Sequence, residues 1–340
     1  MRLRHALYLA SLFAVFASRA SAGSISSGDM LIPIISSSGS PFGSIQERVP
    51  GTSFTLVQTI ALPTGYHYTT GQFTSVIVRG SDHHIFTNVL DTTSGGSVSA
   101  VLELDSSGAF VAVKDNSLAT GGNINQLRFD PLDSTGSTIL GGVAGLSSHE
   151  VDTFNPDAGT QGTKFSLTGA LFKGLAMDSS SNIYASDAAT GKVEKYSSAG
   201  VFTADFTTAA SDHTLSGMSF DTAGNLYVGQ HDSSDVLKYT SLGGFTASYT
   251  GSGLIDIPTG VMFNPGDSQL YVPDLGSAFM ITMHTDGTSA SSFDLDSSAG
   301  GIGIPGIVPA AVPEPGTAAI YFGGMILLLL RRRHVVCGGC

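Results

Sequence analysis

The stretch from Lys173 to Phe206 reads KGLAMDSSSNIYASDAATGKVEKYSSAGVFTADF, and the stretch from Ser216 to Tyr249 follows the same plan as SGMSFDTAGNLYVGQHDSSDVLKYTSLGGFTASY. The two copies align without a gap. Their shared residues recur at intervals of 43 residues, and the first two series reach a third copy: Gly174, Gly217 and Gly260; Asp178, Asp221 and Asn264; Tyr184 and Tyr227. A fixed period in the forties with short alternating segments is typical of the blades of a β-propeller.

Each copy divides into four short strands. In the copy that begins at Lys173 the strands are GLAMD, IYAS, KVEKYS and VFTADF, and the segments between them, DSSSN, DAATG and SAG, are rich in residues that favour turns. Weaker copies can be placed on both sides because they keep the same phase. The sequence predicts five full copies, over 73–114, 124–167, 173–206, 216–249 and 260–296.

Only three strands precede the first full copy. They are MLIPII, GSIQER and FTLVQTI, between Met30 and Ile60, and they match the second, third and fourth strands of a blade. The missing first strand has a candidate at the other end of the repeats, GIGIPGIV from Gly301 to Val308, which Pro305 would keep short. If this segment completes the N-terminal blade, the ring closes and leaves no exposed sheet edge. We therefore predict an all-β fold, a β-propeller of six four-stranded blades over residues 23–308.

The two central copies resemble NHL-type propeller repeats, and the resemblance is clearest over 173–295. Their pattern is a glycine, an apolar pair, Asp, a turn that ends in Asn, a strand of the type Ile-Tyr-Val-Ala-Asp, and a strand with Val and Tyr. This sequence meets it with Gly174, Asp178, Asn182, Ile183, Tyr184, Asp187, Val193 and Tyr196, and with Gly217, Asp221, Gly224, Asn225, Leu226, Tyr227, Val236 and Tyr239. The resemblance implies a fold, since propellers of this kind serve as binding platforms, scaffolds, lyases and lactonases.

Residues 1–22 have the pattern of a cleaved signal peptide. MRLRH is a basic start, ALYLASLFAVFA is an apolar run of twelve, and Ala20, Ser21 and Ala22 give the small-x-small pattern before a cleavage site at Gly23. An uncleaved anchor is the alternative, but twelve residues span only about 18 Å as a helix. We expect export across the inner membrane with removal of this segment.

Residues 309–340 form a predicted sorting tail. Pro313, Glu314 and Pro315 are followed by an uncharged segment, a predicted transmembrane helix over 317–330, and then by Arg331, Arg332 and Arg333. This order resembles a PEP-CTERM sorting signal, although the extension HVVCGGC departs from that pattern. The resemblance implies an exosortase as partner, transient anchoring in the membrane, and delivery to the cell surface or the extracellular space. A permanent C-terminal anchor is the alternative.

Composition limits the partners of the exported part. Residues 23–316 contain all 27 Asp and Glu but only 9 of the 15 Lys and Arg, a net charge of -18. Such a surface repels nucleic acid and anionic lipid. The two cysteines, Cys337 and Cys340, lie in the tail, so residues 23–316 contain no disulfide.

Acidic residues after the second strand of the strong copies are candidate ligands. Asp187 and Asp274 occupy equivalent places, and His231 and Asp232 follow the same strand in the copy between them. From adjacent blades they would converge near the central channel and bind a divalent cation such as calcium. The alternative is that each Asp accepts backbone hydrogen bonds and stabilises its own loop. Tyr66, His67 and Tyr68 are a weaker candidate, a groove for carbohydrate.

Two functions are compatible with these features, and no catalytic residue is assigned. The first is an exported surface or extracellular-matrix protein whose propeller is a non-catalytic binding or scaffold module for a polysaccharide or a protein. The alternative is a periplasmic or surface enzyme, a metal-dependent lactonase or lyase, with the four candidate ligands at the mouth of the channel.

Overall fold

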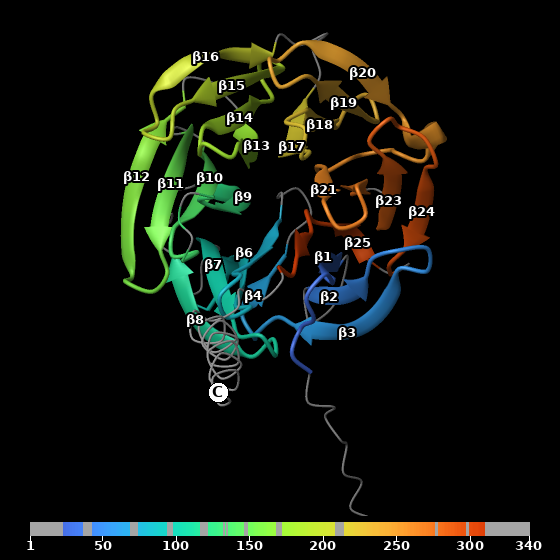
Figure 1. The fold of residues 1–340 in the computed structure, drawn as a ribbon. Coiled ribbons are helices and arrows are strands. Elements are labelled where there is room, and N and C mark those ends of the chain that lie inside the picture. Colours follow the sequence, from blue (N-terminus) through green and yellow to red (C-terminus); the bar gives the residue numbers. More distant parts are fainter. Residues whose placement is uncertain are drawn as a thin grey trace, which may run out of the picture.

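The computed structural model describes residues 23–309 except 37–42, 69–73, 94–97, 116–121, 132, 134, 146–148, 168–171, 208–213, 276–277 and 297–298. Six antiparallel sheets lie around a common axis (Figure 1). The part of the chain that is described contains a single turn of 3-10 helix, Gly251–Gly253, and no α-helix. The predicted six-bladed, all-β propeller is confirmed.

Blades III to VI each consist of four consecutive strands, with the innermost strand first. Blade III is β9 (Gly122–Phe129), β10 (Ile139–Gly145), β11 (His149–Asn155) and β12 (Thr160–Ser166); blade IV is β13 (Phe172–Met177), β14 (Ile183–Asp187), β15 (Lys192–Tyr196) and β16 (Phe202–Thr207). Blade V is β17 (Leu215–Phe220), β18 (Leu226–Gln230), β19 (Asp235–Tyr239) and β20 (Phe245–Tyr249); blade VI is β21 (Met262–Asn264), β22 (Gln269–Pro273), β23 (Phe279–His284) and β24 (Ser291–Asp294).

Blades I and II have an innermost strand that is split in two. In blade II both β4 (Tyr66–His67) and β5 (Val76–Val78) pair with β6 (Ile85–Asp91), which β7 (Val98–Leu104) and β8 (Phe110–Asp115) follow. In blade I both β25 (Ala299–Ile302) and β26 (Gly306–Ile307) pair with β1 (Met30–Ser36), which β2 (Ser44–Val49) and β3 (Thr55–Ala61) follow. The sequence did not predict β4.

Ring closure by the C-terminal segment is confirmed. Ile302 lies opposite Ile34, and Ile307 lies opposite Met30, both in antiparallel pairing. We expected one continuous strand, but the segment is interrupted because Ile304 pairs with Ser75 of blade II. The backbone N–H of Ile304 donates to Thr74 O at 2.8 Å, and its carbonyl accepts from Val76 N at 3.1 Å. The segment therefore ties blade I to blade II as well as closing blade I.

The recurrent Asp and Tyr of the repeat form one hydrogen-bonded unit at the first turn of a blade. Asp178 accepts from the backbone N–H groups of Ser180 and Asn182 at 2.9 and 3.0 Å and from the Tyr184 hydroxyl at 3.0 Å. In blade V, Asp221 accepts the equivalent bonds, including one from the Tyr227 hydroxyl at 3.1 Å. The interval from the Asp to the Tyr in the sequence therefore lets the Tyr hydroxyl on the second strand donate a hydrogen bond to the Asp of the preceding turn.

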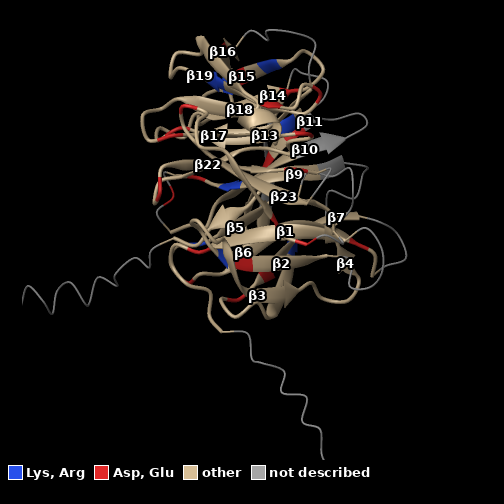
Figure 2. Ribbon diagram, turned by 90° about the vertical axis from the view of Figure 1, so that its right-hand side faces the viewer, with Lys and Arg blue, Asp and Glu red and all other residues tan. Residues whose placement is uncertain are grey.

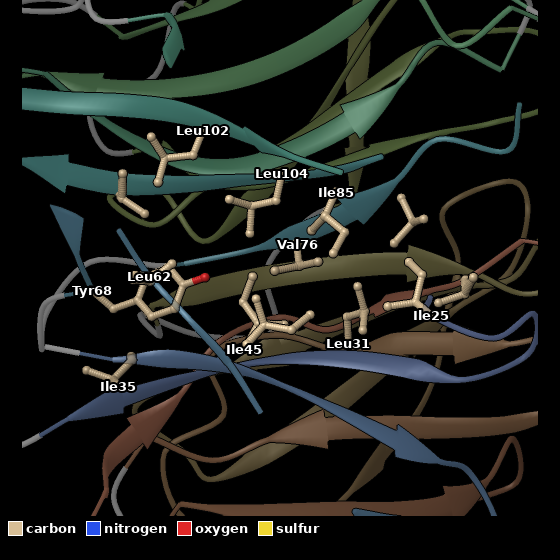
Figure 3. Close-up of a cluster of buried hydrophobic side chains, with 14 of the residues drawn as sticks. Ile25, Leu31, Ile35, Ile45, Leu62, Tyr68, Val76, Ile85, Leu102 and Leu104 are labelled. Carbon is tan, nitrogen blue, oxygen red and sulfur yellow. The ribbon is translucent and has the colours of Figure 1, made fainter. Parts of the chain in front are cut away.

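Apolar side chains between neighbouring blades make the core. Figure 3 shows the cluster between blades I and II, where Leu31 and Ile45 face Val76, Ile85 and Leu102, all without exposed surface. Similar clusters lie between the other blades. Burial of this kind is the main favourable term in folding. Viewed from the side, many acidic residues lie in the turns that join the strands (Figure 2).

Candidate functional site

The closing segment packs against innermost strands near the centre of the ring. Ile304 has no exposed surface and lies against the innermost strands of blades V and VI. A Cβ added to Gly217 would lie 2.5 Å from Ile304 Cδ1, and one added to Gly260 would lie 3.0 Å from it. The recurrent glycine of the repeat is therefore required by close packing at the axis.

The predicted ligands Asp187 and Asp274 are buried in the loops after β14 and β22. Asp187 accepts hydrogen bonds from the backbone N–H of Ala189 and the hydroxyl of Thr190, both at 2.9 Å. Asp274 is 1 % exposed and accepts from the backbone N–H of Ile257 at 3.1 Å. Both carboxylates stabilise loops, as the alternative interpretation expected.

His231 and Asp232 lie together on the surface, in the loop after β18. His231 Nδ1 lies 3.0 Å from Asp232 Oδ1, and Asp232 Oδ2 accepts from the Thr214 hydroxyl at 2.5 Å. The hydrogen bonds from Thr214 and then His231 lower the pKa of Asp232 to about 2. Among the described residues, no group of three or more His, Cys, Asp or Glu side chains is placed to hold a metal ion. A calcium site at these four residues stays a prediction that this geometry does not favour.

The carbohydrate groove suggested by Tyr66, His67 and Tyr68 is wrong in part. Tyr68 is only 2 % exposed, belongs to the core between blades I and II, and its hydroxyl lies 2.8 Å from that of Thr87. Its ring is therefore not available to stack on a sugar. Tyr66 stacks instead on Phe110 of β8, with ring centroids 6.0 Å apart.

A buried ion cluster lies where blade II meets blade III. Glu103, 2 % exposed, lies 2.6 Å from both His84 Nδ1 and Lys114 Nζ, and 3.4 Å from Arg79 Nη2. Arg79 also pairs with Asp157 of blade III at 2.9 Å. These side chains satisfy one another's charge, so loss of any one of them would leave a buried charge without its partner at the contact between blades. Arg79, His84, Glu103 and Lys114 belong to blade II and Asp157 to blade III, and no sequence motif marks them.

A cleft of about 700 Å³ lies between blades I and VI and was not predicted. It is lined by residues from both ends of the propeller and from the turn after β21: Ser27–Asp29, Val49, Pro50, Asn264–Asp267 and Ile307–Pro309. In its wall, burial, a hydrogen bond with Glu47 and the charge of Glu47 raise the pKa of Asp29 to about 6. The cleft exists only because the two ends of the propeller meet, which explains why sequence patterns did not reveal it.

The targeting residues lie mostly outside the described residues. Ala20 and Ala22 precede them, and the predicted sorting motif at 313–315 and 331–333 follows them, as does the predicted helix over 317–330. Gly23, at the predicted cleavage site, is exposed, and its carbonyl accepts a hydrogen bond from Gln58 at 2.9 Å. Within 23–309, apart from the gaps given above, no helix has the length and apolar character needed to cross a membrane.

The closed ring, the loop-bound acids and the cleft define a six-bladed propeller with a recessed surface between its first and last blades. Comparison of the sequence with models of known protein families and with curated proteins finds no match. Comparison with solved structures finds many propellers. A chain in the crystal structure of a nidogen/laminin complex has a TM-score of 0.65 and 13 % identity, over 84 % of this chain and 99 % of that one.

Two further solved structures are similar. A protein of unknown function from Bacteroides caccae has a TM-score of 0.59 and 11 % identity, over 83 % of this chain and 99 % of its own. A luciferin-regenerating enzyme has a TM-score of 0.51 and 16 % identity, over 86 % of this chain and 98 % of its own. The similarity covers most of this chain in each case and agrees with the propeller fold that the repeats predicted. At these identities the similarity establishes the fold alone.

Proposed function

We propose that this chain is an exported, non-catalytic binding propeller, delivered by exosortase sorting to the cell surface or the extracellular matrix. The observation that carries the binding role is the cleft between blades I and VI, about 700 Å³ in volume. Concave sites of this size are where proteins usually take their ligands. In contrast, the carboxylates of Asp187, Asp232 and Asp274, the acids considered for catalysis, accept hydrogen bonds within their own or neighbouring loops.

The chemistry of the cleft limits its partner. Its rim combines the apolar side chains of Val49, Pro50 and Pro309 with the carboxyl groups of Asp29 and Asp267. The surrounding surface is strongly negative, so a neutral polysaccharide or a protein segment without acidic residues is the expected occupant. The nidogen/laminin complex is a precedent in which a chain of this fold takes part in a protein assembly.

The position of the cleft also supports removal of the tail. Val308 and Pro309 line the cleft, and only three residues separate Pro309 from Pro313. Extended, that linker spans roughly 13 Å. A tail that stayed in the membrane would hold the cleft against the bilayer, whereas cleavage would open it to a large partner.

Paired valine substitutions on blade I test the binding role. Val49, 44 % exposed, lines the cleft, and Val57, 51 % exposed, lies on β3 outside the residues that line it. A partner retained from the producer's own extracellular polysaccharide or matrix proteins should be lost with Val49→Asp and kept with the matched control Val57→Asp. If both variants retained the partner equally, the cleft would be excluded as the binding site. Turnover of a lactone panel that depends on added calcium would instead support the enzyme.

Replacement of Pro313, Glu314 and Pro315 by alanine tests the sorting step. Mass spectrometry of the wild-type protein should find a chain that begins at Gly23 and lacks the arginines at 331–333. The triple variant should keep its tail and remain with the membrane fraction. An intact tail on wild-type protein at the cell surface would show that the segment is a permanent anchor.

A further inference from the structure

A second cavity, of about 220 Å³, lies on the axis of the ring. It is found where the innermost strands run into their first turns, and it has a wall residue, Ile307, in common with the cleft. Its lining comes from blades II, III and VI and from the closing segment: Val76, Ile77, Val78, Arg128, Phe129, Met262 and Pro305–Ile307. Arg128 is the one residue in this lining that carries a charge.

Arg128 is partly buried, and few groups of the protein accept hydrogen bonds from its guanidinium. Its Nη2 donates to the carbonyl of Met218 in blade V at 3.0 Å, and its Nη1 donates to the carbonyl of Leu127 at 3.4 Å. No carboxylate of the described residues forms an ion pair with it. A guanidinium has five N–H donors, so most of its capacity is unused. Burial lowers the pKa of Arg128 to about 10.

Two arginines that are more deeply buried, Arg79 and Arg48, have more partners within the protein. Arg79 pairs with the carboxylates of Asp82 and Asp157 at 2.6 and 2.9 Å. Arg48 donates to Gln46 Oε1 at 2.7 Å and to the carbonyls of Phe54 and Leu295 at 2.9 Å each. Arg128 has neither a carboxylate nor a third acceptor among the described residues. It therefore presents unpaired donors beside an apolar space at the axis.

We propose that the axial cavity binds a small organic carboxylate whose apolar body fills the space beside Arg128. The guanidinium geometry matches a carboxylate, which accepts two parallel N–H bonds. Val76, Phe129 and Met262 offer no second charge, so they suit a short hydrocarbon or aromatic body. An inorganic anion would leave these walls unused. The negative charge of the whole chain disfavours anions at long range, so recognition depends on this one side chain.

Calorimetric titration of the full chain with hexanoate, and with hexanamide as the neutral isostere, tests the proposal. We expect hexanoate to bind and hexanamide to bind at least about tenfold more weakly, because it lacks the charge-assisted pair. The Arg128→Gln variant should bind hexanoate about 10- to 100-fold more weakly than the wild type. The Arg128→Lys variant keeps the charge but lacks the paired N–H donors of the guanidinium, so its affinity for hexanoate should be intermediate. Lys192→Gln, which removes an exposed cation on blade IV, is the control and should bind hexanoate as wild type does.

Ile307→Trp supplies a test that leaves Arg128 in place. Ile307 is partly exposed, so the larger ring should fit while filling the cavity. It should abolish hexanoate binding, and the circular dichroism spectrum should show that the propeller is intact. Equal affinity for hexanoate and hexanamide, no binding of either by wild type, or unchanged binding in Ile307→Trp would each overturn the proposal. Ile307 also lines the cleft, so the Arg128→Gln variant, which changes no residue of the cleft, is the test that separates the two sites.

Discussion

The recurrent glycines Gly217 and Gly260 are explained by a close contact with Ile304 near the centre of the molecule. Both glycines leave room for the side chain of Ile304, which comes from the far end of the propeller. The repeat itself is visible in the sequence, but its reason is not, because Ile304 lies outside the repeat. Glycine here is a matter of space, and neither residue has a positive φ.

Gly217→Ala should therefore destabilise the propeller. The new Cβ would lie 2.5 Å from Ile304 Cδ1 and 3.1 Å from the Cα of Gly260, and overpacking of this kind costs about 1–3 kcal/mol. Adding Ile304→Val removes the nearest atom and should restore part of the loss in urea unfolding. Gly80→Ala, where the new atom would meet only Pro309 at 3.7 Å, is the control. Strictly additive losses in the double variant would contradict this account.

Asp29 gives the propeller a stability that depends on pH. Burial and Glu47 raise its pKa to about 6, above the unfolded value near ~3.9. The folded state then holds the proton more tightly, so this contribution is complete below about pH 4 and is lost as the pH rises through about 6. The melting temperature of the wild-type protein should fall across this range. The Asp29→Asn variant is neutral at every pH, so its melting temperature should not show this fall. The Asp205→Asn variant, changed on the exposed strand β16, should still show it.

Single residues with distant partners mark the limit of prediction from this sequence. Asp187 and Asp274 were visible because they occupy equivalent places in the repeat, and Asp232 because it follows the same strand, although their loop-stabilising hydrogen bonds could be judged only from the structure. Asp29 and Arg128 were missed because what distinguishes them is the neighbours that folding brings to them, Glu47 on β2 and Met218 on β17. A pattern within one repeat contains no information on such neighbours.

At the scale of strands, prediction was best where each blade repeats the same local chemistry. The strands of blades IV and V lie where the pattern placed them, because turn residues and alternating apolar residues act within a few positions. The innermost strands of blades I and II were predicted less well. Each is split, and the pieces are placed by pairing with β1 or β6 rather than by their own side chains.

The Asp–Tyr unit is the element on which the strong repeats depend. Asp221 accepts bonds from the N–H groups of Ala223 and Asn225, from the Asn225 side chain and from Tyr227. Asp221→Ala leaves these donors unpaired and should lower the free energy of unfolding by about 2–3 kcal/mol. Asp286→Ala is the matched control in an outer turn, where only Thr288 donates to the carboxylate, and should cost less than about 1 kcal/mol. Similar losses in guanidinium titrations of the two variants would count against this role.

At the scale of the whole molecule, both ends of the propeller meet in blade I. β1 to β3 come from the start of the described chain, and β25 and β26 come from its end. Six blades and closure could be predicted because one blade lacked a strand at the start and one strand was left over at the end. The cleft and the axial cavity could not, since both form from loops and side chains that meet only after the ring has closed.

Closure should therefore decide whether the propeller folds as one unit. A chain that ends at Leu295 lacks Ile302, Ile304 and Val308, three side chains with no exposed surface. At about 1.5–3 kcal/mol for each buried aliphatic side chain, the loss is comparable with the whole stability of a typical domain. Thermal melting should show a transition at least about 10 °C lower, or none, because the edge of β1 and the backbone at Ser75 lose their partners. A chain that ends at Pro309 keeps the closing strand and should melt as the full chain does. If both truncated chains melted alike, closure by the C-terminal segment would not be what holds the ring together.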